Sequence, residues 1–383
     1  MTFRPLRLTR AQTANALVVV ALVAASLWLW AKPNPRPLID TGGLSAVRAE
    51  VESVDDSALQ IHGLVEFGTE RLKVRMPDGT VADAANELRA QLELDKKFEP
   101  GETALVMVPE SGATDGVLVA RDHWRLGWAG ALFALFAGFL LVFGGTTGLR
   151  ALFTFLFSCL AIWKLLIPAV LSGASAALVS FATVATLTAA IQFLVAGFNR
   201  KGASAFLGAI AGVMVSLVLA EFFSSVMHVN GATMPYAQQL LYSGCPGIDL
   251  ADIFVGAAIL ASSGAVMDLA MDIASGIEEV KRHSPTLGFR DLLGSGLRIG
   301  RAVVGTMTTT LLLVYSGGYL TLLMVFAAEG TRPFDFLNST LVSAELVKTL
   351  VGSFGLVLVA PLTALVAALV FTRFGKNEKS SQP

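Results

Sequence analysis

The stretch GAVMDLAMDIASG, residues 264–276, is apolar almost throughout, yet it carries Asp268 and Asp272 four positions apart. It closes the sixth of eight apolar stretches in the chain. Each is about twenty residues long, which at a rise of about 1.5 Å per residue lets a helix cross about 30 Å of hydrocarbon. The eight predicted spans are residues 12–31, 126–145, 149–171, 174–197, 202–224, 252–275, 303–327 and 345–371.

The composition of the whole chain is that of a membrane protein. Of its 383 residues 54% are hydrophobic and only 15% are charged, and the mean hydropathy of +0.66 is well above that of soluble domains. Cys159 and Cys245 are far apart, and the four histidines are scattered, so neither a disulfide framework nor a metal motif follows. We therefore expect no metal, no cofactor and no catalytic motif, and the chain is not predicted to be an enzyme.

Basic residues predict the orientation, because lysine and arginine in short loops stay on the cytoplasmic side. With the N-terminus in the cytoplasm, the opposite short loops hold Arg332 alone. This asymmetry favours eight spans with both termini cytoplasmic. The predicted cytoplasmic segments hold Arg4, Arg7, Arg10, Arg150, Arg200, Lys201, Lys281, Arg282, Arg290, Arg298, Arg301, Arg373, Lys376 and Lys379.

The predicted fold is mainly α, a polytopic bundle of about eight membrane helices with one small β-rich domain. Residues 1–31 form a cytoplasmic tip and an uncleaved first anchor, residues 126–372 a seven-helix bundle, and residues 373–383 a cytoplasmic tail. Residues 32–125 form the domain outside the cytoplasm, opened by the stiff stretch 32–37. Alternating apolar runs predict about five strands there, and ADAANELRAQL (82–92) predicts a short helix, a set typical of an OB-type barrel.

Contact with lipid would be unfavourable for the two aspartates of the opening stretch, because a charge at the bilayer centre costs about 2.5–3.5 kcal/mol. Asp268 and Asp272 belong to a small or acidic stripe at helical spacing that runs from Ala257 through Gly264 to Glu279. One interpretation is a path on which carboxylates accept protons or bind a cation. The other is a structural clamp, in which the acids pair with Arg298 or Arg301 just before the next span.

The last two predicted spans carry further polar residues. Thr306, Thr309 and Tyr315 either line the same path or serve helix packing, and a break near Gly317 and Gly318 would free backbone groups, as in many secondary transporters. Glu345 and Lys348 are three positions apart and therefore able to pair on one helix face. The segment SPTLGFRDLLGSGLRIGR (284–301) alternates apolar and basic positions, which predicts that it lies along the inner leaflet.

Three segments resemble the YibE/F-like family of bacterial multi-pass membrane proteins. They are GAVMDLAMDIASGIEEV (264–280), IGRAVVGTMTTTLLLVYSGGYLTLLMVF (299–326) and AELVKTLVGSFGLVLVAPLTALVAAL (344–369). The resemblance departs from the family pattern at Ala302, where an acidic residue is common, and near Thr309, where an asparagine is. It implies an architecture and motif positions, and no mechanism.

Two functions remain open from the sequence. The first is ion-coupled transport of a small solute or ion, with Asp268 central and with Asp272, Gly264, Thr306, Thr309 and Tyr315 near the path. The second is a non-catalytic membrane scaffold whose external domain binds a cell-envelope protein. In both cases the bilayer is a partner, and nucleic acid is not expected, because Glu66, Glu70 and Asp78 surround the basic face of Arg71, Lys73 and Arg75.

Overall fold

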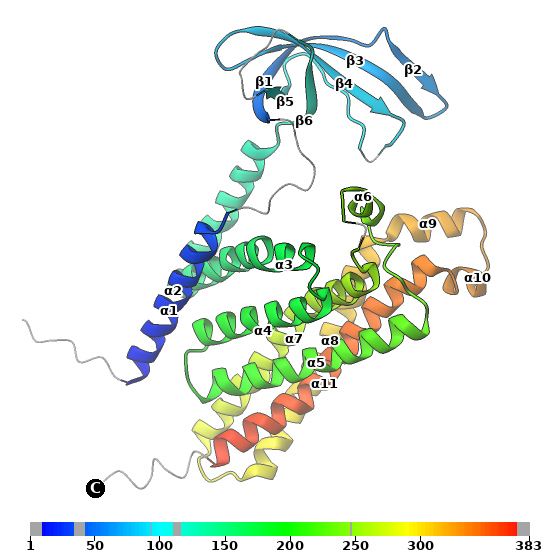
Figure 1. The fold of residues 1–383 in the computed structure, drawn as a ribbon. Helices are drawn as coiled ribbons and strands as arrows, with labels where there is room; N and C mark the ends of the chain where they lie inside the picture. Colours follow the sequence, from blue (N-terminus) through cyan, green and yellow to red (C-terminus); the bar gives the residue numbers. More distant parts are fainter. Residues whose placement is uncertain (1–9, 34–42, 93, 110–115, 246, 374–383) are drawn as a thin grey trace, which may run out of the picture. The chain divides into compact units, whose positions relative to one another are not determined.

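The computed structural model describes residues 10–33, 43–92, 94–109, 116–245 and 247–373, with the side chains of residues 10–17 excepted. The predicted N-terminal tip before residue 10, positions 34–37 of the stiff stretch, and the tail from residue 374 lie outside the described residues. The chain forms two compact units, residues 37–142 and residues 1–36 with 143–383 (Figure 1). The first holds a β-sheet, and the second is helical.

The sheet is closed into a small barrel. Its strands are β1 (Leu44–Asp55), β2 (Leu59–His62), β3 (Val65–Arg75), β4 (Val81–Arg89), β5 (Thr103–Pro109) and β6 (Leu118–His123). Because β1 pairs with both β5 and β3, five strands form a barrel-like sheet in the order β1-β5-β6-β4-β3, and β2 extends it beside β3. The β4–β6 pair is parallel. Alternate side chains point inward and bury a core that includes Val51, Leu72, Val74 and Val106.

The predicted helix at residues 82–92 is wrong, because these residues form most of strand β4. Ala82, Ala84, Asn86 and Leu88 are buried, and the residues between them are more exposed. This burial has a period of two, as in a half-buried strand. Alanine, glutamate and leucine favour helices locally, but pairing with β3 along the whole strand overrides that preference.

The helical unit contains the long apolar helices. Six helical segments of the described residues are long and apolar enough to cross a membrane, the first of them Leu126–Leu171. That segment starts in the barrel unit and consists of α2 (Leu126–Ala161), a π-helix (Ile162–Leu166) and α3 (Ile167–Leu171). The others are α4 (Ala176–Val195), α5 (Arg200–Val226), α7 (Leu250–His283), α8 (Phe289–Gly318) and α11 (Thr340–Arg373).

The unit also contains α1 (Arg10–Ala31) and three short helices, α6 (Ala237–Tyr242), α9 (Leu320–Ala328) and α10 (Pro333–Leu337). Predicted spans 126–145 and 149–171 lie in one helical run, which is interrupted at Gly145, where φ is 52° and ψ is −125°. A left-handed φ is inexpensive only for glycine, so the sequence permits the break at this position. The predicted seventh span divides at Tyr319 into α8 and α9, next to Gly317 and Gly318.

The helix α7 lies at the centre of the bundle and contacts α4, α5, α8 and α11. Small residues let these helices approach closely. A Cβ atom on Gly208 of α5 would lie 2.0 Å from Oγ1 of Thr363 on α11, and one on Gly355 of α11 would lie 2.0 Å from Oγ of Ser216 on α5. Small residues of α5 therefore allow tight contact with α11.

Residues 284–301, which are predicted to lie along the inner leaflet, lead into a long helix of the bundle. From Phe289 onward this segment is the first part of α8, and its small residues pack inside the bundle. A Cβ atom on Gly296 would lie 2.6 Å from Cδ1 of Ile277, and one on Gly300 would lie 2.9 Å from Cβ of Ala360. The amphipathic pattern reflects a helix with one face against α7 and α11.

Candidate functional site

The acidic stripe of α7 lies on the outside of the helical unit. Gly264, Asp268 and Asp272 are all exposed, as are Ala257 and Ala261 earlier on the same stripe. The opposite side of α7 is buried through residues such as Leu269, Ile273 and Ile277. Helix α7 is thus packed mainly through its apolar side, and no described part of this chain covers Asp268 or Asp272.

The depth of Asp268 follows from helix geometry. Sixteen residues separate it from Asp252 in the first turn of α7, which corresponds to about 24 Å along the axis. Asp272 is one turn further on. The apolar residues Leu269, Ala270 and Ile273 between and beside them are buried in the same stretch of helix. Asp268 therefore lies well inside the apolar length of α7.

Neither acid has a cationic partner among the described residues. The arginine Arg298 is exposed and donates from Nη2 to Oγ of Ser295 at 3.0 Å on its own helix, and Arg301 is exposed as well. No ion pair joins either arginine to Asp268 or Asp272 in the described ranges. The proposed clamp between these acids and the start of α8 is thus not formed here, and the carboxylates face outward without a counter-charge from the described part of the chain.

Gly264 differs from the packing glycines of the bundle. A Cβ atom placed on it would meet nothing within 4 Å, whereas Cβ atoms on Gly208 or Gly212 would collide with α11. The small residue one turn before Asp268 therefore leaves open space beside the carboxylates. Close packing inside the chain does not explain it.

Behind the acidic stripe lies a polar side chain that sequence reasoning missed. Gln192 of α4 is 1% exposed, and its Nε2 donates to the carbonyl oxygen of Met267 at 2.9 Å. Its Oε1 is buried and has no hydrogen-bond partner in the described structure. Gln192 thus joins α4 to α7 at the residue before Asp268. The sequence signal for this contact was a single glutamine side chain within the apolar run 174–197.

The polar residues of α8 are divided between two places. Thr306 and Thr309 are exposed, and their hydroxyls donate to carbonyl oxygens of α8 itself, Val303 at 2.9 Å and Gly305 at 3.1 Å. Neither hydroxyl is hydrogen-bonded to the α7 acids in the described chain. Tyr315 faces α11, because a Cβ atom on Gly352 would lie 3.6 Å from its hydroxyl oxygen, which is buried without a partner.

Glu345 and Lys348 pair on α11. Their Oε1 and Nζ atoms are 2.8 Å apart, and the side chains are only 24% and 16% exposed. The same Nζ lies 5.3 Å from the ring centroid of Phe254, a fully buried residue of α7. The pair therefore joins α11 to α7 near the end of the bundle opposite to Asp272.

Asp252, which the sequence did not single out, connects α7 to α4. Its carboxylate accepts from the backbone amides of Ala176 at 2.5 Å and Ala177 at 3.1 Å, and from the hydroxyl of Ser175 at 3.3 Å. These are unpaired amides of the first turn of α4, which attract negative charge. Asp252 at the start of α7 thus caps α4, which lies two spans earlier in the chain, and fixes the relative position of these two helices.

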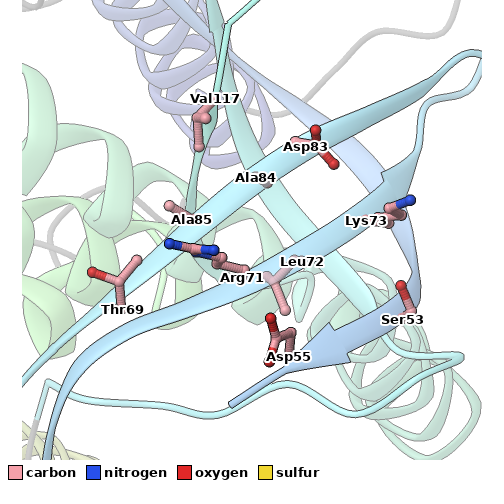
Figure 2. A pocket seen from close by; sticks show the side chains of 10 residues that line it. All are labelled: Ser53, Asp55, Thr69, Arg71, Leu72, Lys73, Asp83, Ala84, Ala85 and Val117. Carbon is pink, nitrogen blue, oxygen red and sulfur yellow. The ribbon is translucent and has the colours of Figure 1, made fainter. Parts of the chain in front are cut away.

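The barrel carries a second polar site on its outer face. A groove of about 510 Å³ lies over β1, β3 and β4. Figure 2 shows Thr69, Arg71 and Lys73 at alternate positions of β3, with Asp55 of β1 on one side and Asp83 of β4 on the other.

Charges of both signs remain open in this groove. Hydrogen bonds from Ser57 lower the pKa of Asp55, so this carboxylate is ionised at neutral pH. The described cations Arg75 and Lys97 form ion pairs elsewhere on the domain, with Glu52 and with Asp56 and Glu66. Arg71 and Lys73 form none among the described residues. The groove therefore presents two cations and two carboxylates to the solvent.

Comparison with known proteins gives one result for the helical part of the chain. The family model described as YibE/F-like protein matches residues 132–373, most of the chain. The match begins within α2 and extends through α11, so it includes the acidic stripe of α7 and leaves out the barrel. No curated protein and no solved structure matches the chain.

Proposed function

The chain belongs to the YibE/F-like family, and from this premise we propose that it moves a small solute or ion across the membrane by an ion-coupled mechanism. The observation that carries the proposal is the exposed α7 face with Asp268 and Asp272, which have no cationic partner among the residues that the structure describes. Ionised carboxylates inside a bilayer require water, protein or a bound cation. A hydrated path along this face supplies both water and a bound cation.

In this mechanism Asp268 binds the coupling cation or proton. Asp272 is the next binding position, one helical turn nearer to the end of the span. Gly264 provides the room beside them, since a side chain there would enter open space. Thr306 and Thr309 of α8 are proposed to lie near the path, whereas the hydroxyl of Tyr315, which was predicted beside them, is buried against α11. The protein resides in the plasma or inner membrane of a bacterium, with about eight spans, both termini in the cytoplasm and the OB-type barrel on the opposite side.

The experiment replaces Asp268 with asparagine, which keeps the size of the side chain and removes its titration. Purified protein is reconstituted in liposomes that contain a pH-sensitive dye, and proton and sodium fluxes are followed under an imposed membrane potential. We expect Asp268→Asn to abolish the flux and to keep its thermal unfolding transition. Glu329→Gln, which changes an exposed carboxyl outside the stripe, is the matched control and retains the flux. Full flux in Asp268→Asn refutes the assignment.

We propose the scaffold function as a second candidate, because the barrel groove gives it a specific basis. Its open charges of both signs suit an envelope protein that offers charges of both signs in return. In cells, cross-linking recovers the partner with the unaltered chain. The charge reversals Arg71→Glu and Lys73→Glu together are expected to lose it, while Arg121→Glu, an exposed change outside the groove, keeps it. Equal recovery from all three chains contradicts this function.

A further inference from the structure

A separate cavity lies where the barrel leads into the first membrane helix. Strand β6 ends at His123, and α2 begins three residues later at Leu126 (Figure 1). The cavity has a volume of about 620 Å³ and lies within the barrel unit. The residues that line it and that carry the argument are Glu102, His123, Trp124, Arg125, Trp128 and Leu132.

One wall of this cavity is charged with both signs. Arg125 donates from Nη1 to Asp122 at 2.7 Å, and the fork of a guanidinium has five N–H donors, so donors remain for a second anion. Glu102 lies close by. Its Oε2 accepts from the amide of Glu99 at 2.9 Å and is 3.5 Å from Nδ1 of His123, which leaves its other oxygen for a cation.

The other wall is apolar and belongs to the membrane helix. Trp128 is 84% exposed and Leu132 is 70% exposed, and between Leu126 and Val142 no described side chain of α2 is buried. A helix that is apolar on every side fits a membrane span. Tryptophan is enriched where such a helix meets the headgroup region. The cavity therefore passes from charged groups to hydrocarbon contacts within about two turns of helix.

We propose that this cavity binds an aminophospholipid, a lipid whose headgroup carries both a phosphate and a primary amine. The phosphate is held by Arg125, because guanidinium and phosphate oxygens form paired charge-assisted hydrogen bonds. The ammonium group donates to the carboxylate of Glu102. The glycerol and the upper part of an acyl chain lie against Trp128 and Leu132. The charge pattern selects the headgroup, and the apolar wall selects a lipid over a soluble phosphate.

The test measures lipid retention by native mass spectrometry of the full chain released from mixed-lipid nanodiscs. The probes are phosphatidylethanolamine, phosphatidylcholine, whose amine has no N–H donor, and phosphatidylglycerol, which has no amine. We expect phosphatidylethanolamine to be retained about tenfold better than either of the others, the factor that one charge-assisted hydrogen bond is worth. Equal retention of the three lipids overturns the proposal.

Variants separate the two contacts. Glu102→Gln keeps the acceptor for Glu99 and is expected to abolish the preference for phosphatidylethanolamine over phosphatidylglycerol, while Arg125→Gln lowers the retention of both. Arg121→Gln removes an exposed cation of β6 outside the cavity and is expected to behave as the unaltered chain. Displacement of the lipid by an equal concentration of soluble phosphoethanolamine would contradict the apolar half of the site. Retention unchanged in Arg125→Gln would contradict the phosphate contact.

Discussion

The substitution Gly264→Leu tests whether the acidic face of α7 lines a path. In the described chain a Cβ atom on Gly264 meets nothing within 4 Å, so the leucine side chain enters open space beside Asp268. A glycine in a helix costs about 1 kcal/mol relative to a good helix former. The variant is therefore expected to be as stable as the unaltered protein, or more stable by up to about 1 kcal/mol, and to conduct poorly because the side chain obstructs the path.

The matched control is Gly212→Leu in α5, which introduces the same side chain at a packed position. A Cβ atom there would lie 2.9 Å from Cβ of Val359 and 3.0 Å from Cγ1 of Val266, between three helices. Overpacking of this kind costs about 1–3 kcal/mol or more. Gly212→Leu should therefore lower the free energy of unfolding, while Gly264→Leu should not.

The assay combines flux in proteoliposomes with thermal unfolding in detergent. Gly264→Leu is expected to show an unchanged or raised unfolding temperature together with a reduced flux. Undiminished flux in a folded Gly264→Leu protein would refute the idea that solute or ion passes this face. Destabilisation equal to that of Gly212→Leu would show that the face is packed against protein, and it would also refute an open path.

Three further outcomes test other parts of the structure. Burial raises the pKa of Glu70 above its ordinary 4.5, against the opposing hydrogen bonds from Asn86 and Phe98, so the folded barrel binds this proton more tightly than the unfolded chain. The barrel should therefore become less stable as the pH rises from 4.5 through the raised pKa. Glu70→Gln should make barrel stability less dependent on pH. Both effects are measured as the resistance of the full chain to proteolysis across this pH range. Asp252→Ala should lower the free energy of unfolding by about 1–2 kcal/mol, because it uncaps α4, with Asp252→Asn milder in the same thermal assay. Lys348→Met should lower the free energy of unfolding by about 1–3 kcal/mol, because it leaves Glu345 half-buried without its partner. Adding Glu345→Gln to this variant should restore most of the lost stability. An unchanged unfolding temperature in Lys348→Met would contradict the pairing.

Much of the fold was predictable because it depends on local properties. Runs of about twenty apolar residues identify membrane helices without knowledge of their neighbours, and i, i+4 spacing places Asp268 and Asp272 on one face of any helix. The alternating runs predicted the strands of the barrel for the same reason. Residues 82–92 were the exception, since their local helix preference yields to pairing with β3, which lies nearby only in the folded barrel.

The surroundings of the candidate site could not be predicted in this way. Gln192 meets the carbonyl of Met267 across 75 positions of sequence, and Asp252 caps a helix that begins 76 positions earlier. Such contacts depend on how α4 and α7 pack, and one sequence contains no direct record of that packing. The same holds for the barrel groove, whose charges come from three strands.

What the sequence by itself determined is that this chain is a membrane protein of the YibE/F-like family with a β-rich domain and with two acids on one face of an apolar helix. Hydropathy, periodicity and motif similarity are properties of short segments, so they can be recognised without knowledge of the tertiary structure. Only the tertiary structure decided that this face points away from the rest of the bundle, that Arg298 and Arg301 leave it unpaired, and that Gly264 opens onto free space. Which side of a helix is covered depends on the neighbours that pack against it, and those neighbours are distant in the sequence.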